Sequence, residues 1–269
     1  MHGLGNDFVV IDAVTQDISL DSKQVKFIAD RHFGIGCDQL LLVEKSETAD
    51  TDFRYRIFNN DGSEVEQCGN GARCFAEFVY AEGLTDKTEI SVLTSGGRIV
   101  LNRQENGCVA VDMGSPILTP PKIPFVANET SSAYHLEIDG ERLTFGAVSM
   151  GNPHAVFIVD NVDTAEVERI GKLLQVNSHF PNSVNVGFMQ VINPSQVKLR
   201  VYERGVGETQ ACGTGACAAV VAGIVQGVLD ETVETQLLGG NLSIHWAGEQ
   251  NPVMMTGATA TVFKGQITL

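Results

Sequence analysis

One cysteine motif occurs twice in the chain, as Cys-Gly-Asn-Gly-Ala at 68–72 and Cys-Gly-Thr-Gly-Ala at 212–216. Each copy precedes an apolar run and follows a polar stretch that holds a glutamate four residues upstream of the cysteine. Two opposed thiols suit a reaction that removes a proton from one face of a carbon and returns one to the other. The repetition therefore predicts a duplicated protein in which Cys68 and Cys212, one from each half, act as an acid/base pair at a shared site.

The glycines after each cysteine predict a turn that opens a helix. Unpaired amide N–H groups gather at such a start, beside the positive end of the helix dipole, which carries roughly half an elementary charge. These groups bind a carboxylate and lower the pKa of a nearby thiol below its free value of about 8.5. They would also stabilise the enediolate that forms when an α-proton leaves a bound amino acid. The motif therefore favours cofactor-independent proton transfer at the α-carbon of an amino acid.

Other uses of the cysteines remain open at this point. A single cysteine before a glycine-rich helix start is usually structural, and only the duplication favours catalysis. The sequence contains no Cys-x2-Cys pair, which disfavours a zinc site and thioredoxin-like chemistry, so we expect no metal. A thiol-redox regulator remains an alternative, in which a Cys68–Cys212 disulfide would be an oxidised, inactive state. The other cysteines are predicted to be small core residues: Cys37, Cys74, Cys108 and Cys217.

Composition limits the class of protein. The 269 residues are 43% hydrophobic, as in a globular protein, and the net charge is −15. This charge argues against nucleic acid and anionic membranes as partners. The first residues lack a basic segment followed by an apolar one, and no run approaches 18 apolar residues. We therefore expect a cytoplasmic protein with reduced thiols and a small-molecule substrate.

Short β-rich segments alternate with fewer helical ones, which predicts an α+β fold. Gly-Asn elements at Asn6 and Asn152 precede similar strands and lie at similar distances from the two cysteines. The run after Cys212 is apolar nearly all round, as in a helix buried on most faces. We predict two pseudo-symmetric domains, each a strand-rich sheet or barrel around its post-cysteine helix, divided near the proline-rich stretch 114–124. Predicted strands are 8–12, 39–44, 53–59, 88–94, 97–102, 108–113, 147–149, 155–159, 184–191 and 196–203; predicted helices are 21–30, 73–80, 164–174 and 217–228.

Several polar residues have two readings each. Arg204 ends a predicted strand shortly before the second motif, where it is either a solvated loop charge or a bidentate clamp for a carboxylate. His154 either tunes a thiol or caps a turn. Four asparagines either occupy turns or hold carboxylate and ammonium groups: Asn6, Asn59, Asn152 and Asn185.

These blocks closely resemble those of the diaminopimelate epimerases, cofactor-independent bacterial enzymes of lysine and cell-wall precursor synthesis. The resemblance spans essentially the whole chain and is most specific around the two cysteines. It rests on the blocks 2–8, 59–63, 67–74, 151–154, 182–186, 203–209 and 212–215. The resemblance implies that Cys68 and Cys212 invert one stereocentre between LL- and meso-diaminopimelate without a cofactor.

The resemblance also implies roles for the substrate-binding residues. The reacting α-carboxylate is expected on backbone amides at Gly69, Asn70, Gly213 and Thr214. The distal end of the substrate is expected on Asn59, Asn152, Asn185 and Arg204. Asn6 and Gln39 are expected to line the site, with Glu203 also at the substrate and His154 supporting proton traffic.

The family fold implies two domains, 1–113 and 114–257, with a C-terminal strand at about 258–269 returning to the first. It further implies an active site in a cleft that closes over substrate, and a homodimer. Family members usually have a short strand before the segment that starts here at Met1, and its loss would leave a neighbouring edge unpaired and lower stability.

Three rival functions fit less well. Proline racemase-like enzymes also use two cysteines, but they lack the Asn-Gly-Ala-Arg continuation found here at 70–73. Phenazine-type isomerases of the same fold replace the thiol pair. A non-catalytic binder of a diamino diacid would have no need for both thiols.

Overall fold

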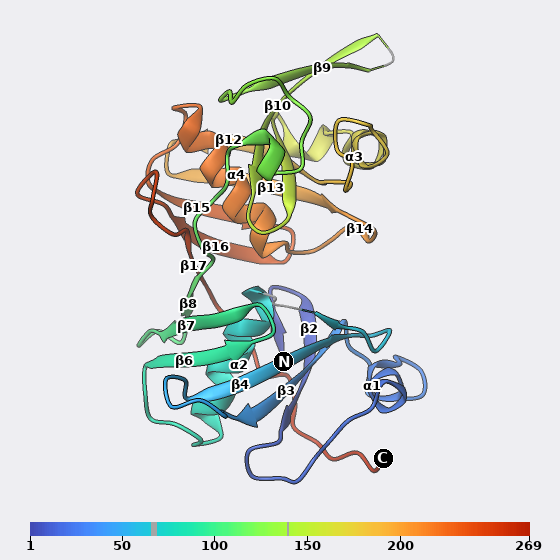
Figure 1. Cartoon of the computed structure of the whole chain (residues 1–269), viewed down its shortest axis with the longest axis vertical. Coiled ribbons are helices and arrows are strands. Elements are labelled where there is room, and N and C mark those ends of the chain that lie inside the picture. Colours follow the sequence, from blue (N-terminus) through green and yellow to red (C-terminus); the bar gives the residue numbers. More distant parts are fainter. Residues whose placement is uncertain (66–68, 139) are drawn as a thin grey trace. The chain divides into compact units, whose positions relative to one another are not determined.

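The computed structural model describes residues 1–65, 69–138 and 140–269. Cys68, the first of the two predicted catalytic thiols, therefore lies outside the described residues. The chain divides into two compact units, which Figure 1 shows in the colours of the sequence. Unit 1 comprises Met1–Asp112 and Thr256–Leu269, and unit 2 comprises Met113–Met255.

The described residues of unit 1 form short strands and two helices. Its elements are β1 (His2–Gly3), β2 (Asn6–Asp12), α1 (Ser22–Ala29), β3 (Gln39–Lys45), β4 (Phe53–Asn59), β5 (Glu64–Val65), α2 (Gly69–Ala81), β6 (Glu89–Thr94), β7 (Gly97–Arg103) and β8 (Val109–Asp112). Strand β2 pairs in parallel with β3, and β3 pairs antiparallel with β4. Strand β4 then pairs antiparallel with β5 and in parallel with β6, which forms a hairpin with β7.

Unit 2 repeats this arrangement. Its elements are η1 (Pro120–Lys122), β9 (Tyr134–Ile138), β10 (Glu141–Ser149), β11 (Pro153–Ile158), η2 (Val162–Thr164), α3 (Val167–Gln175), β12 (Asn185–Asn193), β13 (Gln196–Glu203), β14 (Gly207–Glu208), α4 (Gly213–Val225), β15 (Thr232–Leu237) and β16 (Gly240–His245). Strand β17 (Met254–Gly257) begins in unit 2 and ends in unit 1. Strand β11 pairs in parallel with β12, and β12 pairs antiparallel with β13. Strand β13 pairs antiparallel with β14 and in parallel with β15, which forms a hairpin with β16.

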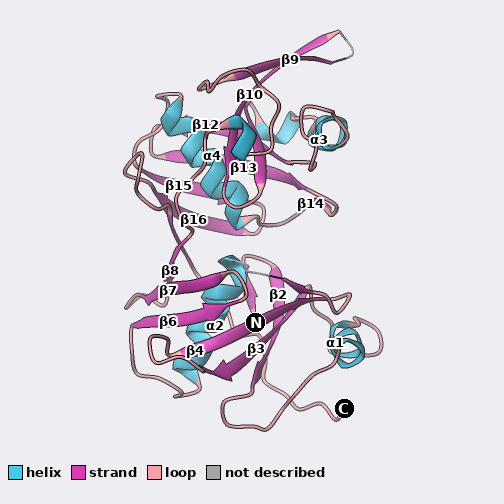
Figure 2. Cartoon of the chain, viewed as in Figure 1, coloured by secondary structure: helices cyan, strands magenta, loops and turns pink. Residues whose placement is uncertain are grey.

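The order and direction of these pairings are the same in both units, so the predicted pseudo-symmetric α+β architecture is confirmed. Figure 2 shows the same predominance of strands over helices in each unit. In unit 2, α4 is buried at every position from Gly215 to Gly223. Small side chains let the strands pack closely around it, as the apolar run predicted. In unit 1, α2 is likewise buried through most of its first two turns, including the charged Arg73.

The turns before β2 and β11 depend on a glycine. Gly5 and Gly151 have φ angles of 87° and 89°, in the left-handed region that glycine tolerates best. They immediately precede Asn6 and Asn152. The repeated Gly-Asn element thus serves the backbone: it turns the chain and places Asn6 at the start of β2 and Asn152 directly before β11.

The sequence-based assignment of strands is incomplete in both units and wrong at the C-terminus. Strands β9, β15, β16 and β17 and the two-residue strands β1, β5 and β14 were not predicted. The expected strand over 258–269 is not formed: Ala260 makes an isolated bridge with His2, and no described residue after it lies in a strand. Its β-branched residues favour extended backbone, but Val262 and Phe263 are exposed. Of the helices described, none has the length and apolar character to cross a membrane.

Candidate functional site

Cys212 lies at the N-terminus of α4 and is buried, with 4% of its surface exposed. Its backbone is extended (φ −121°, ψ 108°), so the chain turns into the helix directly after it. A Cβ on Gly215 would lie 3.1 Å from a methyl of Val201 and 3.2 Å from the Cys212 sulfur. The second glycine of the motif therefore leaves the space that the thiol occupies against the first helical turn.

A carboxylate faces the Cys212 thiol. The Sγ of Cys212 donates to Oε2 of Glu203 over 3.0 Å, and the hydroxyl of Thr209 donates to Oε1 over 2.5 Å. Burial raises the pKa of Cys212 well above its ordinary value, and the charge of Glu203 raises it further. The amide of Gly215 and the hydroxyl of Thr214 act in the opposite direction. Cys212 is therefore a protonated thiol in this state, suited to act as an acid.

A chain of polar side chains reaches Cys212 from the other side. Nε2 of His154 lies 3.0 Å from Oδ1 of Asn152, and Nδ2 of Asn152 donates to Oγ1 of Thr214 over 3.4 Å. The Thr214 hydroxyl is 3.6 Å from the Cys212 sulfur. An amide oxygen only accepts hydrogen bonds, so His154 must carry its proton on Nε2. Because the Thr214 oxygen accepts from Asn152, its hydroxyl proton can be donated to a thiolate at Cys212.

Burial and the nearby charge of Arg204 lower the pKa of His154 to about 3. An unfolded histidine binds a proton near pH 6.5, whereas the folded one stays neutral down to about pH 3, so acidification across this window destabilises the fold. We expect the free energy of unfolding to fall by up to about 1.4 kcal/mol per pH unit from this group. Urea denaturation at several pH values should show that the free energy of unfolding depends less steeply on pH in His154→Gln than in wild type. An equal pH dependence in the two proteins would contradict a neutral buried His154.

Asn185 and Arg204 are held by backbone contacts. Nδ2 of Asn185 donates to the carbonyl of Pro153 over 3.2 Å, and its Oδ1 accepts from the amide of Arg204 over 2.9 Å. The guanidinium of Arg204 donates to the carbonyl of Asn182 over 2.9 Å. Asn185 thus fixes the start of the loop that carries Arg204, which was not foreseen from the sequence.

In unit 1, the predicted site residues Asn6 and Asn70 contact each other. Nδ2 of Asn70 donates to Oδ1 of Asn6 over 3.3 Å, and Nδ2 of Asn6 donates to Asp38 over 3.1 Å. Oδ1 of Asn70 accepts from the fully buried Arg73 over 2.8 Å. Arginine only donates hydrogen bonds and a carboxylate only accepts them, so Arg73 and Asp38 determine which way the two amides point. Arg31 forms ion pairs with Asp38 and with the aspartate that follows Asn6, which holds the Asp38 carboxylate in place.

Two further predicted residues of unit 1 form a second contact. Nε2 of Gln39 donates to Oδ1 of Asn59 over 3.0 Å, across the β3–β4 pair in which these residues are directly opposite. The Asn59 side chain also donates to Oγ of Ser63 over 3.2 Å. Both residues lie at strand ends, next to the turn that leads toward the first cysteine motif.

The predicted site residues occupy equivalent positions in the two units. The register that pairs Phe8 with Gln39 also pairs His154 with Asn185. The matched pairs are Asn6 with Asn152, Gln39 with Asn185, Asn59 with Glu203, and Asn70 with Thr214. The residues of unit 1 thus contact one another, as do those of unit 2. The two units differ at one matched pair, where unit 2 has the carboxylate of Glu203 and unit 1 has the neutral amide of Asn59.

Three residues that hold the predicted ones were not foreseen from the sequence: Arg73, Asp38 and Thr209. Arg73 stood out as a charge inside an apolar helix, and this was the one available signal. Asp38 and Thr209 gave none, because their partners are distant in the chain or lie on a neighbouring strand. No group of three histidine, cysteine or acidic side chains in the described part of the chain is placed to hold a metal ion.

Comparison with known proteins decides the family. The family model described as diaminopimelate epimerase matches residues 1–119 and 146–262. The chain belongs to the diaminopimelate epimerase family. A relative named diaminopimelate epimerase from Thioalkalivibrio sulfidiphilus is 61% identical over 271 residues, covering 100% of this chain and 98% of the relative. Enzymes of the same name from Teredinibacter turnerae and Pseudomonas aeruginosa are 56% and 57% identical, with the same coverage.

Solved structures with low identity share the fold of this diaminopimelate epimerase family member. A probable proline racemase from Agrobacterium radiobacter superposes with a TM-score of 0.69 at 14% identity, covering 100% of this chain and 91% of that one. A phenazine biosynthesis protein of the PhzF family from Bacillus anthracis gives 0.66 at 18% identity, covering 96% and 92%. The two rival families therefore share the architecture, whereas the high sequence identity lies with the diaminopimelate epimerases.

Proposed function

We propose that this protein is a cofactor-independent isomerase that interconverts LL- and meso-diaminopimelate. Family membership at 61% identity supports the substrate. The observation that supports the chemistry is Cys212, a buried thiol at the start of a helix with a carboxylate 3.0 Å away. Such a thiol can deliver a proton to a carbanion and receive one in the reverse direction.

In the proposed mechanism Cys68 begins as a thiolate and removes the α-proton from one face of the substrate. Cys212 begins as the thiol, because burial and Glu203 raise its pKa, and gives its proton to the opposite face. The proton that leaves the carbon ends on Cys68, and Cys212 ends as a thiolate. Gly215 and Thr214 stabilise that thiolate, and the roles exchange for the reverse reaction.

The reacting carboxylate is proposed to bind the amides at the two helix starts, at Gly69, Asn70, Gly213 and Thr214. These amides would stabilise the enediolate formed when the α-proton leaves. We assign the distal end of the substrate to Asn59, Asn152, Asn185 and Arg204, with Asn6, Gln39 and Glu203 lining the site and His154 supporting it. We propose that the site draws its residues from both an N-terminal domain, 1–113 with the C-terminal segment, and a C-terminal domain, 114–257.

The proposal places the protein in lysine and cell-wall precursor synthesis, in the cytoplasm and as a homodimer. A strongly acidic chain with a net charge of −15 suits a small-molecule partner better than nucleic acid or an anionic membrane.

Deuterium incorporation tests the proposed function. Freshly reduced protein is incubated with LL-diaminopimelate in D2O without pyridoxal phosphate, and the α-proton signal is followed by NMR. We expect the signal to fall while meso product appears, with L-proline and L-lysine unchanged as control substrates. Binding of diaminopimelate by calorimetry without any exchange would instead identify a binder and overturn the proposal.

A further inference from the structure

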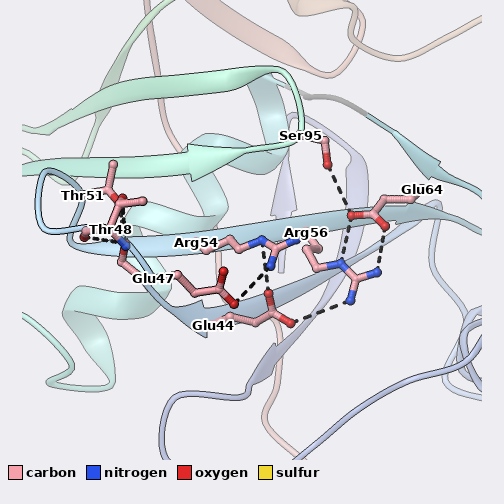
Figure 3. Close-up of polar contacts among 9 residues, drawn as sticks. Glu44, Glu47, Thr48, Thr51, Arg54, Arg56, Glu64 and Ser95 are labelled. Atoms are coloured by element: carbon pink, nitrogen blue, oxygen red, sulfur yellow. Dashed lines mark hydrogen bonds and ion pairs between the residues drawn. The ribbon is translucent and has the colours of Figure 1, made fainter.

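Each unit contains a bidentate ion pair at the same distance from its cysteine motif. In unit 1, Nε and Nη2 of Arg56 lie 2.9 and 2.8 Å from the two carboxylate oxygens of Glu64, as Figure 3 shows. In unit 2, the same atoms of Arg200 lie 2.5 and 2.8 Å from those of Glu208. The arginine precedes the glutamate by eight residues in both pairs. Each glutamate precedes the motif cysteine by four residues.

Both ion pairs join the two strands of a hairpin in the same register. Glu64 is opposite Phe58 in the β4–β5 hairpin, and Glu208 is opposite Tyr202 in β13–β14. Strands β5 and β14 have only two residues each, so the ladder alone holds them weakly. A bidentate arginine–carboxylate pair adds both energy and a fixed geometry. The ion pair therefore adds a side-chain attachment of the short second strand to its neighbour.

In unit 2 the hairpin also carries the groups that face the thiol. Glu203 ends β13 and accepts from both Cys212 and Thr209. Thr209 follows the anchored Glu208 directly, and its amide donates to the carbonyl of Val201 over 3.3 Å. Fixing Glu208 thus aligns Thr209 with Glu203, which in turn sets the carboxylate against the Cys212 sulfur.

The surroundings of the two pairs differ, although the pairs themselves match. Arg56 lies over the ring of Phe58, 4.9 Å from its centre, and Glu64 accepts from Ser95 over 3.3 Å. The network continues through Glu44, Arg54 and Glu47 (Figure 3). Arg200 instead donates to the carbonyl of Val162 over 3.0 Å. The shared element is thus the arginine–glutamate pair and its spacing, not the local environment.

We propose that Arg200 and Glu208 are positioning residues that set the contact between Glu203 and Cys212. This inference rests on the proposed function for its catalytic consequence. It predicts that the Arg200–Glu208 pair controls the reactivity of Cys212, whereas the equivalent pair of unit 1 does not.

Alkylation of individual cysteines tests the proposal. Wild type, Glu208→Gln and Glu64→Gln are treated with iodoacetamide across pH 7–10, and mass spectrometry follows Cys68 and Cys212 separately. Glu208→Gln should raise the rate at Cys212 about tenfold at pH 8, because a displaced Glu203 no longer raises its pKa, and leave Cys68 within twofold. Glu64→Gln removes the equivalent ion pair of unit 1 and should leave the rate at Cys212 within twofold.

Further variants separate positioning from general loosening of the fold. The exchange Arg200→Glu with Glu208→Arg should restore most of the wild-type rate at Cys212. Glu168→Gln removes an exposed ion pair of α3 and should alter neither cysteine. The kcat of Glu208→Gln should be about tenfold below that of wild type, whereas the two KM values should differ by less than twofold.

Equal changes at both cysteines in Glu208→Gln, or none, would overturn the proposal, as would a lowered melting temperature that alone accounts for the effect in every variant. Alkylation needs no substrate. A selective change at Cys212 in a protein that does not turn over diaminopimelate would therefore support the positioning role of the Arg200–Glu208 pair and refute the proposed function.

Discussion

Cys212→Ala is expected to lower the rate of epimerisation by about 10²- to 10⁴-fold, the range of a lost general acid–base group. The variant removes the proton donor for one face of the substrate, and neither Glu203 nor Thr214 replaces the sulfur at its position. Cys68→Ala should have an equal effect, because inversion requires proton transfer on both faces. The measurement is the rate of meso product formation from LL-diaminopimelate, with α-deuterium incorporation followed in parallel.

Cys217→Ala is the matched control for Cys212→Ala. Both residues belong to the α4 region, five positions apart, and both are buried. We expect the control to keep kcat within about threefold and to lose a little stability through the cavity that it leaves. Epimerisation by Cys212→Ala above a tenth of the wild-type rate would contradict two-thiol catalysis.

Gly34→Ala is expected to destabilise the protein by about 3 kcal/mol, in the upper range for overpacking a closed site. A Cβ at this position would lie 1.8 Å from the carbonyl oxygen of Phe27 in α1. The backbone around Gly34 wraps the end of that helix, with the amides of Gly34, Ile35 and Cys37 donating to its last carbonyls and to Asp30. An added methyl must push this segment away and break some of those hydrogen bonds.

The measurement is urea denaturation of Gly34→Ala beside Gly265→Ala. A Cβ on Gly265 meets the ring of Phe263 at 3.6 Å, an ordinary contact, so this variant should be within about 0.5 kcal/mol of wild type. Gly34→Ala should also weaken substrate binding, because the same segment leads to Asp38 and hence to Asn6. Unchanged stability would contradict the prediction, because it would mean that the backbone at the end of α1 moves aside for the methyl group at little cost.

The sequence predicted those features that repeat or that have a local cause. The duplicated Cys-Gly-x-Gly motif predicted α4, because glycine and small apolar residues are needed where strands pack closely around a helix. The Gly-Asn repeat predicted the strands that follow it, because the glycine of each repeat has a positive φ angle, which glycine adopts most readily.

Features that depend on distant partners could not be predicted. The hydrogen bond from Cys212 to Glu203 joins the end of one strand to the start of a helix. The ion pair of Arg56 with Glu64 depends on a hairpin register that the turn residues alone do not define. Strands β15 and β16 alternate buried and more exposed positions, but they contain few apolar residues. Their threonine, glutamine and asparagine side chains made the alternation of a strand difficult to recognise in the sequence.

The discontinuity of unit 1 has a consequence for synthesis on the ribosome. Unit 2 is one uninterrupted stretch, whereas unit 1 needs its final residues: Ala260 bonds to His2 in both directions, and Ile267 packs against the core around Leu20 and Ile28. Domains usually fold in the order in which they emerge. Here the half that is translated first is completed last, so a stalled or C-terminally blocked chain would carry a finished second unit attached to an unfinished first one.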